Sequence, residues 1–474
     1  MDLRTTFYTV LLVLSFIGAD AAEAAQNEQP NILIIMADDL TYNDLPIYGG
    51  NNVQTPNVDK LASEGMVFNN AFVTMSMCNP CRAELYTGLY PVSNGIMWNH
   101  SRARDGVKSI VQYLDDEGYR TGLAGKVHVA PTSVFPFEMV EGLERKCVSR
   151  TAKFETGGLQ EFIERDSEQP FCLVSALVVP HIPWTVGDPS NFDPKELKLP
   201  PYLADTPEIR KEFAKYLAEI EVFDRQVGRA LDLLEKTGEA DNTIVILTSE
   251  QGGQWLFCKW TNYDAGVHTS FIVRWPGKVK EGGRTDALIQ YVDVLPTLLD
   301  AVGAYDESDF DGKSFLPVLF GKKDAHREYA YFMHNNFPEG PSYPIRSVTD
   351  GTYHYVRNLN HEEIYIEKHL MARMPLNTYW PSWIFQSTTN AGTKDLVNRY
   401  MHRPSEEFYN MEADPFEMHN IASDKGKKKK LEELSYKLDQ WMKSQGDPGG
   451  DVDTRKSHEN AKKGDHFSIS KKGD

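Results

Sequence analysis

No segment beyond the first 25 residues of this 474-residue chain is apolar over the roughly 20 positions that a membrane span needs, so we expect no transmembrane helix. Basic residues are also in short supply: 50 Lys and Arg stand against 68 Asp and Glu, giving a formal net charge of −18. Nucleic-acid binding needs a basic face, so this balance argues against a nucleic-acid partner. An anionic substrate is still compatible, because a local cluster of Arg, Lys and metal can outweigh distant carboxylates.

Cysteine is scarce, and no His/Cys cluster has the spacing of a zinc site. The count of five is odd, so in an exported protein at least one cysteine is free, modified or paired outside the chain. The five are Cys78, Cys81, Cys147, Cys172 and Cys258. Composition does not single out any of them.

The N-terminus has the pattern of a signal peptide. Arg4 precedes an apolar run at residues 7–17, and small residues suited to cleavage follow at 19–21 and 22–24. A membrane anchor is the rival interpretation, but the run is too short to span a bilayer. We therefore expect residues 1–25 to be a signal peptide and the protein to be periplasmic or secreted.

Apolar runs of strand length alternate with helical patterns over much of the chain. This alternation predicts an α/β fold in which helices cover both faces of a large, mostly parallel sheet. The expected strands are residues 31–36, 121–124, 171–179, 243–248 and 271–275, and the expected helices are 55–65, 109–118 and 208–237.

One charge interrupts the apolar stripe of the longest predicted helix. The stripe is formed by Leu217, Ile220, Val227, Leu231 and Leu234, at spacings of three and four, and Asp224 lies within it. We interpret Asp224 as a buried carboxylate satisfied by neighbouring donors rather than as a catalytic group.

The pattern changes beyond about residue 320. Residues 344–355 alternate around Asp350-Gly351, which predicts a hairpin, and Leu431, Leu434, Leu438 and Trp441 mark an amphipathic helix. We expect a catalytic domain at 26–320 and a smaller antiparallel subdomain with a helix at 321–445. A flexible polar tail is expected at 446–474.

Polar side chains follow four of the predicted strands. In parallel α/β sheets, ligands bind beyond the carboxyl ends of the strands, so these residues should meet at one edge. They are Asp38 and Asp39 after the first strand, Lys126 and His128 after the second, His181 after the third, and Glu250 and Gln251 after the fourth, with Lys259 a few residues on. Such a coincidence is hard to explain by packing alone.

The oxygens of this set suit a hard divalent cation. Carboxylate and amide oxygens are the ligands that calcium prefers, and Asp38, Asp39, Glu250 and Gln251 supply them. Asp38-Asp39 alone would indicate a helix N-cap. Together with the second acidic strand end it predicts a metal site.

The most specific segment runs from Cys78 to Gly88, with the order Cys-Asn-Pro-Cys-Arg-Ala-Glu-Leu-Tyr-Thr-Gly. It resembles the signature of the sulfatase family, C-x-P-x-R followed by L-x-T-G. The resemblance implies that Cys78 is oxidised to formylglycine (3-oxoalanine) by a formylglycine-generating enzyme that reads this motif. Because the first four residues also form C-x-x-C, an exported thiol-redox protein using Cys78 and Cys81 is the competing interpretation.

Further segments extend the resemblance over most of the chain. Residues 30–39 are similar to the family's opening strand, 125–128 to its G-K-x-H element, 180–183 to its P-H-x-P element, and 406–415 to its closing strand and D-P turn. The implied fold is alkaline phosphatase-like. Two departures stand out: Cys81 replaces the usual Ser or Ala, and Glu250-Gln251 replaces Asp-Asn or Asp-His, which lengthens each arm by one methylene.

The resemblance also implies a role for each site residue. Calcium, held by Asp38, Asp39, residue 78, Glu250 and Gln251, would polarise a hydroxyl of hydrated formylglycine that a carboxylate such as Glu250 deprotonates. Arg82, Lys126 and Lys259 would hold the sulfate oxygens. His181 with Lys259 would protonate the leaving alcohol, and His128 would take the proton from the second hydroxyl.

Three segments bear on the identity of the substrate. Residues 249–252 and 258–262 look more like bacterial polysaccharide sulfatases than human lysosomal ones, which favours a sulfated carbohydrate, with ulvan first and glycosaminoglycans second. An aromatic, basic stretch with His369, Arg373, Tyr379, Trp380 and Trp383 is either a sugar-binding loop or a hydrophobic flap. Two further functions compete with a sulfatase: a phosphoester or phosphonate hydrolase of the same superfamily, and a non-catalytic sugar-binding relative.

Overall fold

The computed structural model describes residues 29–148, 150–371, 379–465 and 467. The expected signal segment at 1–25 and Arg373 lie outside these residues. Within the described part of the chain, no helix combines the length and the apolar character needed to cross a bilayer.

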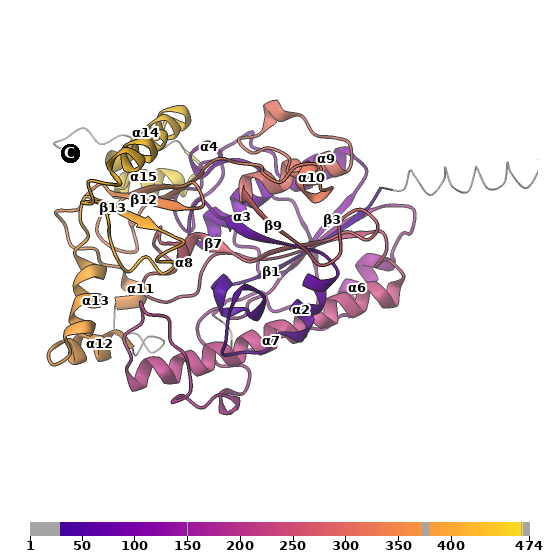
Figure 1. The fold of residues 1–474 in the computed structure, drawn as a ribbon. Coiled ribbons are helices and arrows are strands. Elements are labelled where there is room, and N and C mark those ends of the chain that lie inside the picture. The colour runs from indigo at the N-terminus through magenta and orange to yellow at the C-terminus, as the bar shows by residue number, and fades with distance from the viewer. Residues whose placement is uncertain (1–28, 149, 372–378, 466, 468–474) are drawn as a thin grey trace, which may run out of the picture.

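A nine-stranded mixed sheet forms the centre of the molecule (Figure 1). One half is parallel: β4, β3, β5, β1 and β6 lie side by side in that order, and β1 pairs with both β5 and β6. In the other half β8 joins β6 and β2 in antiparallel pairs. The strands are β1 (Asn31–Ala37), β2 (Met66–Phe72), β3 (Arg120–Gly125), β4 (Glu138–Val140), β5 (Phe171–Ala176), β6 (Thr243–Ser249), β7 (His268–Thr269), β8 (Phe271–Arg274) and β9 (Gly283–Gln290).

The predicted fold class is confirmed, with one difference in strand direction. The run at 271–275 was expected in the parallel sheet, yet β8 runs antiparallel to β6. An apolar run carries no information on direction. The segment between β6 and β8 contains only the short helix α8 (Asp264–Val267) and β7, so no long crossover helix returns the chain to the start of the sheet.

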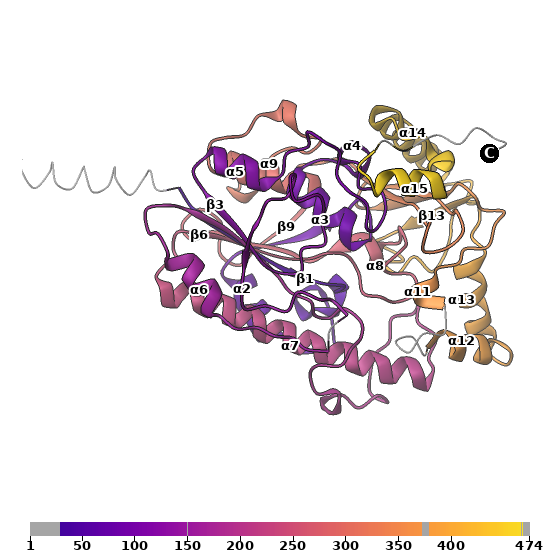
Figure 2. The same ribbon diagram turned by 180° about the vertical axis from the view of Figure 1, so that it is seen from behind.

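Helices cover both faces of the sheet (Figures 1 and 2). On β1, Leu33 and Ile35 join the core on the side of α7, whereas Ile32 and Ile34 join the core on the side of α5 and α9. Successive residues of β1 therefore point into opposite cores, which is why consecutive positions of this strand are apolar. One face carries α2 (Pro56–Ser63), α6 (Gly157–Glu164) and α7 (Pro207–Thr237), and the other carries α3 (Cys78–Thr87), α5 (Ile110–Asp116) and α9 (Val294–Ala301).

A four-stranded antiparallel sheet follows, with α14 (Lys428–Gln445) packed against it. Its hairpin turns at Asp350-Gly351 as predicted: Gly351 adopts φ +88°, and Asp350 accepts hydrogen bonds from the N–H groups of Thr352 and Tyr353. Met333 N donates to Thr74 O, which ties this sheet to the first. The strands are β10 (Ala330–His334), β11 (Ile345–Thr349), β12 (Tyr353–Asn358) and β13 (Glu406–Asn410).

Residues expected in a flexible tail instead form two short elements, η6 (Gly449–Val452) and α15 (Arg455–Ala461). The buried carboxylate of Asp453 holds them, because it accepts the N–H groups of Asn336, Phe337 and Tyr343 at 2.8–2.9 Å. Apolar patterning cannot reveal an element that is held by hydrogen bonds.

Shorter elements complete the described chain. They are α4 (Pro91–Asn94), α10 (Leu316–Leu319), α11 (Lys368–Met371), α12 (Tyr379–Ser387), α13 (Ala391–Met401), η1 (Tyr42–Asp44), η2 (Pro46–Tyr48), η3 (Pro189–Asn191), η4 (Tyr291–Asp293) and η5 (Glu307–Asp309).

Asp224 on α7 caps the first turn of α2. Its carboxylate accepts the backbone N–H groups of Asn57 and Val58 at 2.9 Å and the side-chain amide of Asn57 at 2.7 Å. The structure thus confirms the interpretation of a buried carboxylate satisfied by neighbours, since it bridges two helices on one face of the sheet.

Replacing Asp224 with Ala removes the acceptor for two helix N-terminal N–H groups. We expect the free energy of unfolding to fall by about 1–3 kcal/mol, measured by chemical denaturation. Asp232→Ala, at an exposed position on the same helix, is the control. A loss in Asp224→Ala no larger than in the control would contradict the capping role.

Candidate active site

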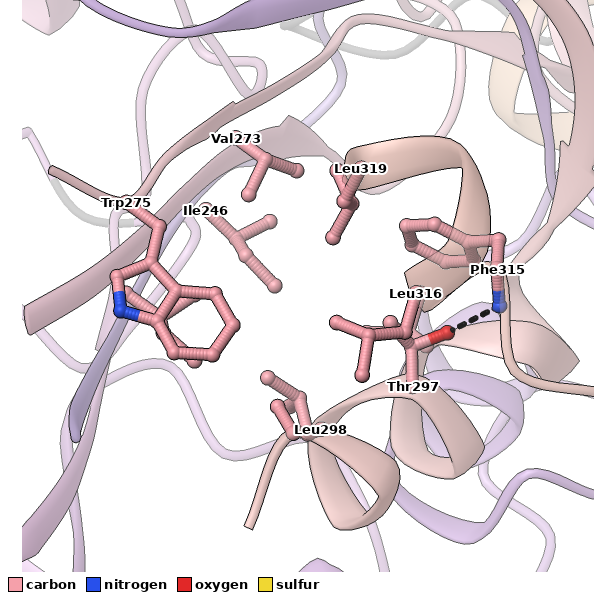
Figure 3. A pocket seen from close by; sticks show the side chains of 11 residues that line it. Ile246, Val273, Trp275, Thr297, Leu298, Phe315, Leu316 and Leu319 are labelled. Carbon is pink, nitrogen blue, oxygen red and sulfur yellow. Dashed lines mark hydrogen bonds between the residues drawn. The ribbon is translucent and has the colours of Figure 1, made fainter. Parts of the chain in front are cut away.

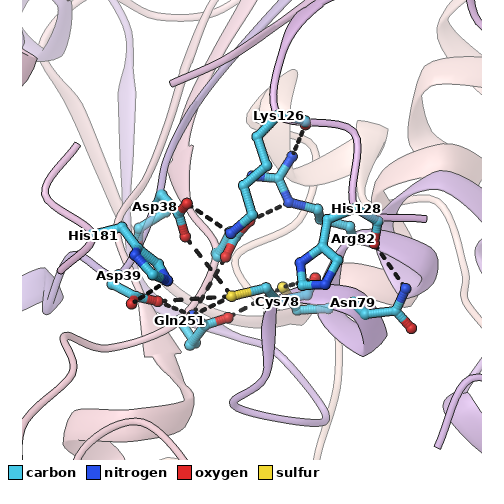
Figure 4. Close-up of polar contacts among 12 residues, drawn as sticks. Asp38, Asp39, Cys78, Asn79, Arg82, Lys126, His128, His181 and Gln251 are labelled. Carbon is cyan, nitrogen blue, oxygen red and sulfur yellow. Dashed lines mark hydrogen bonds and ion pairs between the residues drawn. The ribbon is translucent and has the colours of Figure 1, made fainter. Parts of the chain in front are cut away.

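Four neighbouring parallel strands bring the predicted site residues together. Because β3, β5, β1 and β6 are adjacent, the residues that follow them meet at one edge of the sheet. Figure 4 shows Asp38, Asp39, Lys126, His181 and Gln251 grouped around the start of α3, where Cys78 lies. The predicted convergence of the strand ends is therefore what the structure shows.

The backbone conformation at two strand ends orients these side chains. Gly125 ends β3 at φ +98°, and a Cβ there would lie 2.1 Å from the carbonyl oxygen of Ala176, so only glycine fits before Lys126. Asp39 and His128 adopt φ values of +62° and +46°, which are uncommon for residues with a side chain. Such conformations concentrate at functional sites.

Cys78 is the first residue of α3 and is buried. Its Sγ lies 3.2 Å from Lys259 Nζ, 3.8 Å from Asp38 Oδ1 and 3.9 Å from Asp39 Oδ1. Burial, reinforced by Glu250 and opposed by Lys126, raises the pKa of the Cys78 thiol well above its usual value. An unmodified thiol with this pKa is a poor nucleophile, because the thiolate is the reactive form.

Ligand atoms of four residues converge beside Cys78. One atom from each of Asp38, Asp39, Cys78 and His181 lies within 4.8 Å of the others. His181 Nδ1 is 2.5 Å from the carbonyl oxygen of Ile182, so Nδ1 carries the hydrogen and Nε2 presents a lone pair. That lone pair faces Asp39 Oδ2 at 3.4 Å. Two acceptors turned toward each other, next to a second carboxylate, form a place suited to a cation.

The chemistry of these donors fits a hard divalent cation only in part. Carboxylate oxygens are the preferred ligands of such ions, whereas a cysteine sulfur is a soft ligand. An oxygen in place of the sulfur of residue 78 would complete an oxygen-rich set. The residues present therefore fit a divalent metal together with an oxidised residue 78.

Glu250 and Gln251 reach the site but are engaged by other groups. The Glu250 carboxylate forms an ion pair with Arg82 Nε and lies 3.4 Å from Lys126 Nζ. Burial raises the pKa of Glu250, but Arg82 and Lys126 outweigh it and hold the pKa below its usual value. Gln251 Nε2 donates to Asp39 Oδ1, and Gln251 Oε1 accepts from Cys81 Sγ at 3.3 Å. Their role as metal ligands stays a prediction.

Three buried cations face the carboxylates. Lys126 Nζ donates to Asp38 Oδ2 at 2.6 Å, and Lys259 Nζ donates to both oxygens of Asp39 at 2.7 and 2.8 Å. Arg82 Nη1 donates to the carbonyl oxygen of Lys126, and the guanidinium also interacts with the Tyr86 hydroxyl. Guanidinium and ammonium groups held in this way are suited to binding an oxyanion.

The two predicted histidines are both held neutral. Burial lowers the pKa of His181 to about 3, with Asp39 opposing and Lys259 adding to the effect. Burial and then Lys126 lower the pKa of His128 well below its usual value. His128 Nδ1 is buried without a partner among the described residues, and Nε2 lies 3.3 Å from His100 Nδ1. A neutral imidazole with a bare nitrogen is able to accept a proton.

Sequence reasoning missed the residues that support this arrangement. Asn79 Nδ2 donates to the carbonyl oxygen of His128, Asn79 N donates to Asn99 Oδ1, and His100 contacts His128. Asn79 lies inside the recognised motif but has no fixed identity in it. His100 lies 28 positions before its partner, with no spacing rule to connect them.

The aromatic stretch belongs largely to the core. Tyr379, Trp380 and Trp383 are buried in α12, where the Tyr379 ring packs against Trp255. His369 stacks on the Trp260 ring, and its Nε2 lies 2.6 Å from Glu339 Oε2, so the half-buried His369 is a polar member of this stretch that the structure describes. The hydrophobic-flap interpretation holds for the aromatic residues.

A separate apolar cavity offers no polar chemistry. Figure 3 shows Ile246, Trp275 and Leu298 among its lining residues, between the sheet and the helices α9 and α10. Thr297 is the polar side chain in this lining, and its hydroxyl oxygen already accepts a hydrogen bond from Phe315 N. The cluster of charged side chains at the edge of the sheet is therefore the better candidate for an active site.

Comparison with known proteins identifies the family and the fold. The family model described as Sulfatase matches residues 30–304, and the one described as N-sulphoglucosamine sulphohydrolase, C-terminal, matches residues 252–374. An ulvan-active sulfatase of Formosa agariphila is 33% identical over 431 residues, covering 90% of this chain and 82% of the relative.

Two further matches are more distant. The human N-sulphoglucosamine sulphohydrolase is 28% identical over 473 residues, covering 88% of this chain and 91% of the relative. A solved structure of a protein in complex with its substrate D-glucosamine-2-N,6-O-disulfate superimposes with a TM-score of 0.69 at 23% identity. The match covers 89% of this chain and 99% of that one, and at this identity it shows the shared fold.

The convergent ligand atoms predict that a divalent cation stabilises the folded protein. With Ca²⁺ at about 100 times its dissociation constant, the gain should be about 2.7 kcal/mol, seen as a rise in melting temperature. Asp39→Asn should abolish the rise. Asp44→Asn, which changes a buried carboxylate hydrogen-bonded to Tyr216, should keep it. An equal rise in Asp39→Asn would refute the site.

Proposed function

The chain belongs to the sulfatase family and is a sulfuric ester hydrolase, and on this premise we propose that it removes sulfate from a sulfated polysaccharide or its oligosaccharides. The observation that carries the proposal is the set of three buried cations, Arg82, Lys126 and Lys259, around residue 78. A sulfate group presents oxygens that repel an incoming nucleophile. Fixed cations offset that charge and do so more strongly in a buried site.

We propose that Cys78 is converted to formylglycine and that calcium binds at Asp38 and Asp39. When present, the hydrated aldehyde supplies a nucleophilic hydroxyl and calcium supplies positive charge that polarises it. The buried, protonated thiol of Cys78 supports the proposal, because the unmodified residue is a weak nucleophile. The oxygen-rich surroundings of Asp38 and Asp39 support the choice of a hard cation.

The side chains around residue 78 have three roles: binding sulfate oxygens, donating a proton and accepting a proton. Arg82 and Lys126, which are both buried in the cluster, bind sulfate oxygens. Lys259 carries the proton for the leaving alcohol at neutral pH, because burial lowers the pKa of its neighbour His181 to about 3. His128 is the base, since its buried Nδ1 has no partner among the described residues and is free to accept a proton.

We further propose that the protein is exported to the periplasm or secreted and matures by contact with a formylglycine-generating enzyme. The signal-like pattern of residues 1–25 supports export. We also keep the proposed division into a catalytic domain at 26–320 and a subdomain at 321–445. It agrees with the two separate sheets, whose strands end at Gln290 and begin again at Ala330.

Ulvan is the first proposed substrate and glycosaminoglycans are the second. The order follows the similarities: the ulvan-active relative is 33% identical, and the human N-sulphoglucosamine sulphohydrolase is 28% identical. Both named activities act on sulfated compounds, and both matches cover most of this chain.

A thiol-redox function is less compatible with the site. Cys78 and Cys81 are both buried, and burial raises the pKa of each thiol well above its usual value. Thiol–disulfide exchange needs an accessible thiolate with a lowered pKa. The surroundings of the C-x-x-C pair therefore favour modification of Cys78 over redox cycling.

Mass spectrometry of the peptide containing residue 78 tests the proposed nucleophile. Protein made with a competent modifying enzyme should carry an aldehyde at 78, and its release of sulfate from an aryl sulfate should exceed that of Cys78→Ser by at least about 10³-fold. Cys81→Ser should keep most of the activity. Full activity with an intact sulfhydryl at 78, or loss of all activity in Cys81→Ser with the aldehyde present, would overturn the assignment.

Sulfate release from polymers tests the substrate. We expect ulvan oligosaccharides to be desulfated faster than glycosaminoglycan oligosaccharides, measured as released sulfate by ion chromatography. Aryl phosphate in parallel reports on a phosphoester hydrolase function, since one fold serves both chemistries. Sulfate release from neither carbohydrate, or faster turnover of aryl phosphate than of aryl sulfate, would remove the proposal.

A further inference from the structure

A second histidine contacts the proposed base, and no motif accounts for it. His100 Nδ1 lies 3.3 Å from His128 Nε2, and the two ring centroids are 4.9 Å apart. His100 is exposed, whereas His128 is mostly buried. The pair therefore joins a buried nitrogen of the site to a residue at its rim.

Backbone contacts hold the segments that carry these two histidines side by side. Ala103 N donates to the carbonyl oxygen of Ala130 at 2.8 Å, so the segment after His100 runs beside the segment after His128. Asn79 anchors both from α3: its side chain donates to the carbonyl oxygen of His128, and its backbone N–H donates to the side chain of Asn99. The helix that begins at residue 78 thus fixes both histidines.

Both histidines adopt left-handed backbone conformations, His100 at φ +60° and His128 at φ +46°. A non-glycine residue in this region is strained and persists only where its surroundings hold it. Two such residues in contact mean that the surrounding structure over-determines their positions. A contact that forms by chance on a surface would not need either conformation.

The hydrogen-bonding capacity of the two rings fixes the direction of their contact. A neutral imidazole carries one N–H and one lone pair. If His128 Nε2 carries the hydrogen, it donates to His100 Nδ1 and leaves the buried Nδ1 of His128 as the bare nitrogen. The opposite tautomer would bury an N–H with no acceptor among the described residues, which is unfavourable.

We infer that His100 is a positioning residue: it accepts the Nε2 hydrogen of His128 and so holds His128 in the tautomer whose Nδ1 serves as the base at residue 78. This inference rests on the proposed function for its catalytic meaning. The logic is that of a base oriented by a third group, with a neutral imidazole in the place usually taken by a carboxylate. Figure 4 shows the His128 ring among the side chains that surround Cys78.

Charged groups around the pair keep His100 available as an acceptor. Burial lowers the pKa of His100, Glu339 opposes this, and Lys462, His369 and Lys126 add to it. Lys126, Glu250 and Arg82 face His128 in the same way, with Glu250 opposing the two cations. A neutral His100 has a lone pair at Nδ1 to offer, and protonation of His100 at low pH would remove it.

Two substitutions at position 100 separate the acceptor from the ring. His100→Gly fits φ +60° without strain and removes the acceptor. His100→Asn also tolerates this conformation and places an amide oxygen where Nδ1 lies. We expect kcat to fall about tenfold or more in His100→Gly with little change in KM, and to stay within about threefold of wild type in His100→Asn. His419→Gly, at an exposed histidine, is the control.

The pH dependence of kcat distinguishes a positioning role of His100 from a purely structural one. The low-pH limb of kcat should shift to lower pH in His100→Gly, because protonation of residue 100 no longer withdraws the acceptor. It should stay in place in His419→Gly. Melting temperatures of all variants show whether any loss of kcat reflects unfolding.

Nitrogen-15 NMR of histidine-labelled protein with Cys78 unmodified reads the tautomer without any turnover. His128, assigned by comparison with His128→Gln, should be the Nε2–H tautomer in wild type and His100→Asn, and a mixture in His100→Gly. The inference is overturned by a wild-type kcat in His100→Gly, by equal losses in Gly and Asn variants, or by an unchanged tautomer in His100→Gly. If wild-type protein releases no sulfate, the proposed function fails while the tautomer still decides this inference.

Discussion

The burial of six opposite charges at one edge of the sheet is the constraint on which the site depends. Asp38, Asp39 and Glu250 come from two adjacent strand ends, and Arg82, Lys126 and Lys259 meet them from three other segments. A buried charge without a partner costs several kcal/mol, so each group requires the others. The charges therefore bind strands, the helix α3 and the loop after β6 into one rigid edge.

This constraint explains which parts of the site can be predicted from a sequence. Residues such as Asp38, Lys126 and Glu250 directly follow apolar runs, and parallel strands bring such positions together by geometry alone. Cys78 and Arg82 were recognised because one short segment carries both. His100 and Asn99 were missed, because they lie on a loop whose place beside His128 depends on tertiary contacts.

The fold shows the same division between patterned and contact-held elements. The strands β1, β3, β5 and β6 are buried on both faces, and the prediction found each within a few residues. The sequence does not reveal that β8 runs antiparallel to β6, because hydrophobicity does not encode direction. The ordered segment with α15 was missed because a carboxylate, Asp453, holds it through backbone N–H groups rather than through an apolar stripe.

Counting charges also shows why fixed side chains alone do not suffice for an anionic substrate. Three carboxylates are paired with three cations, and the pKa shifts of both site histidines and of the Cys78 thiol favour their uncharged forms, so few charges at this edge are left unpaired. The whole chain adds a net charge of −18, which repels sulfated polymers at long range. A divalent cation held by Asp38 and Asp39 would add two positive charges to the local balance and release the lysines from these carboxylates. The same ion that suits the ligand atoms is thus the one that would turn a self-paired cluster into a site for sulfate.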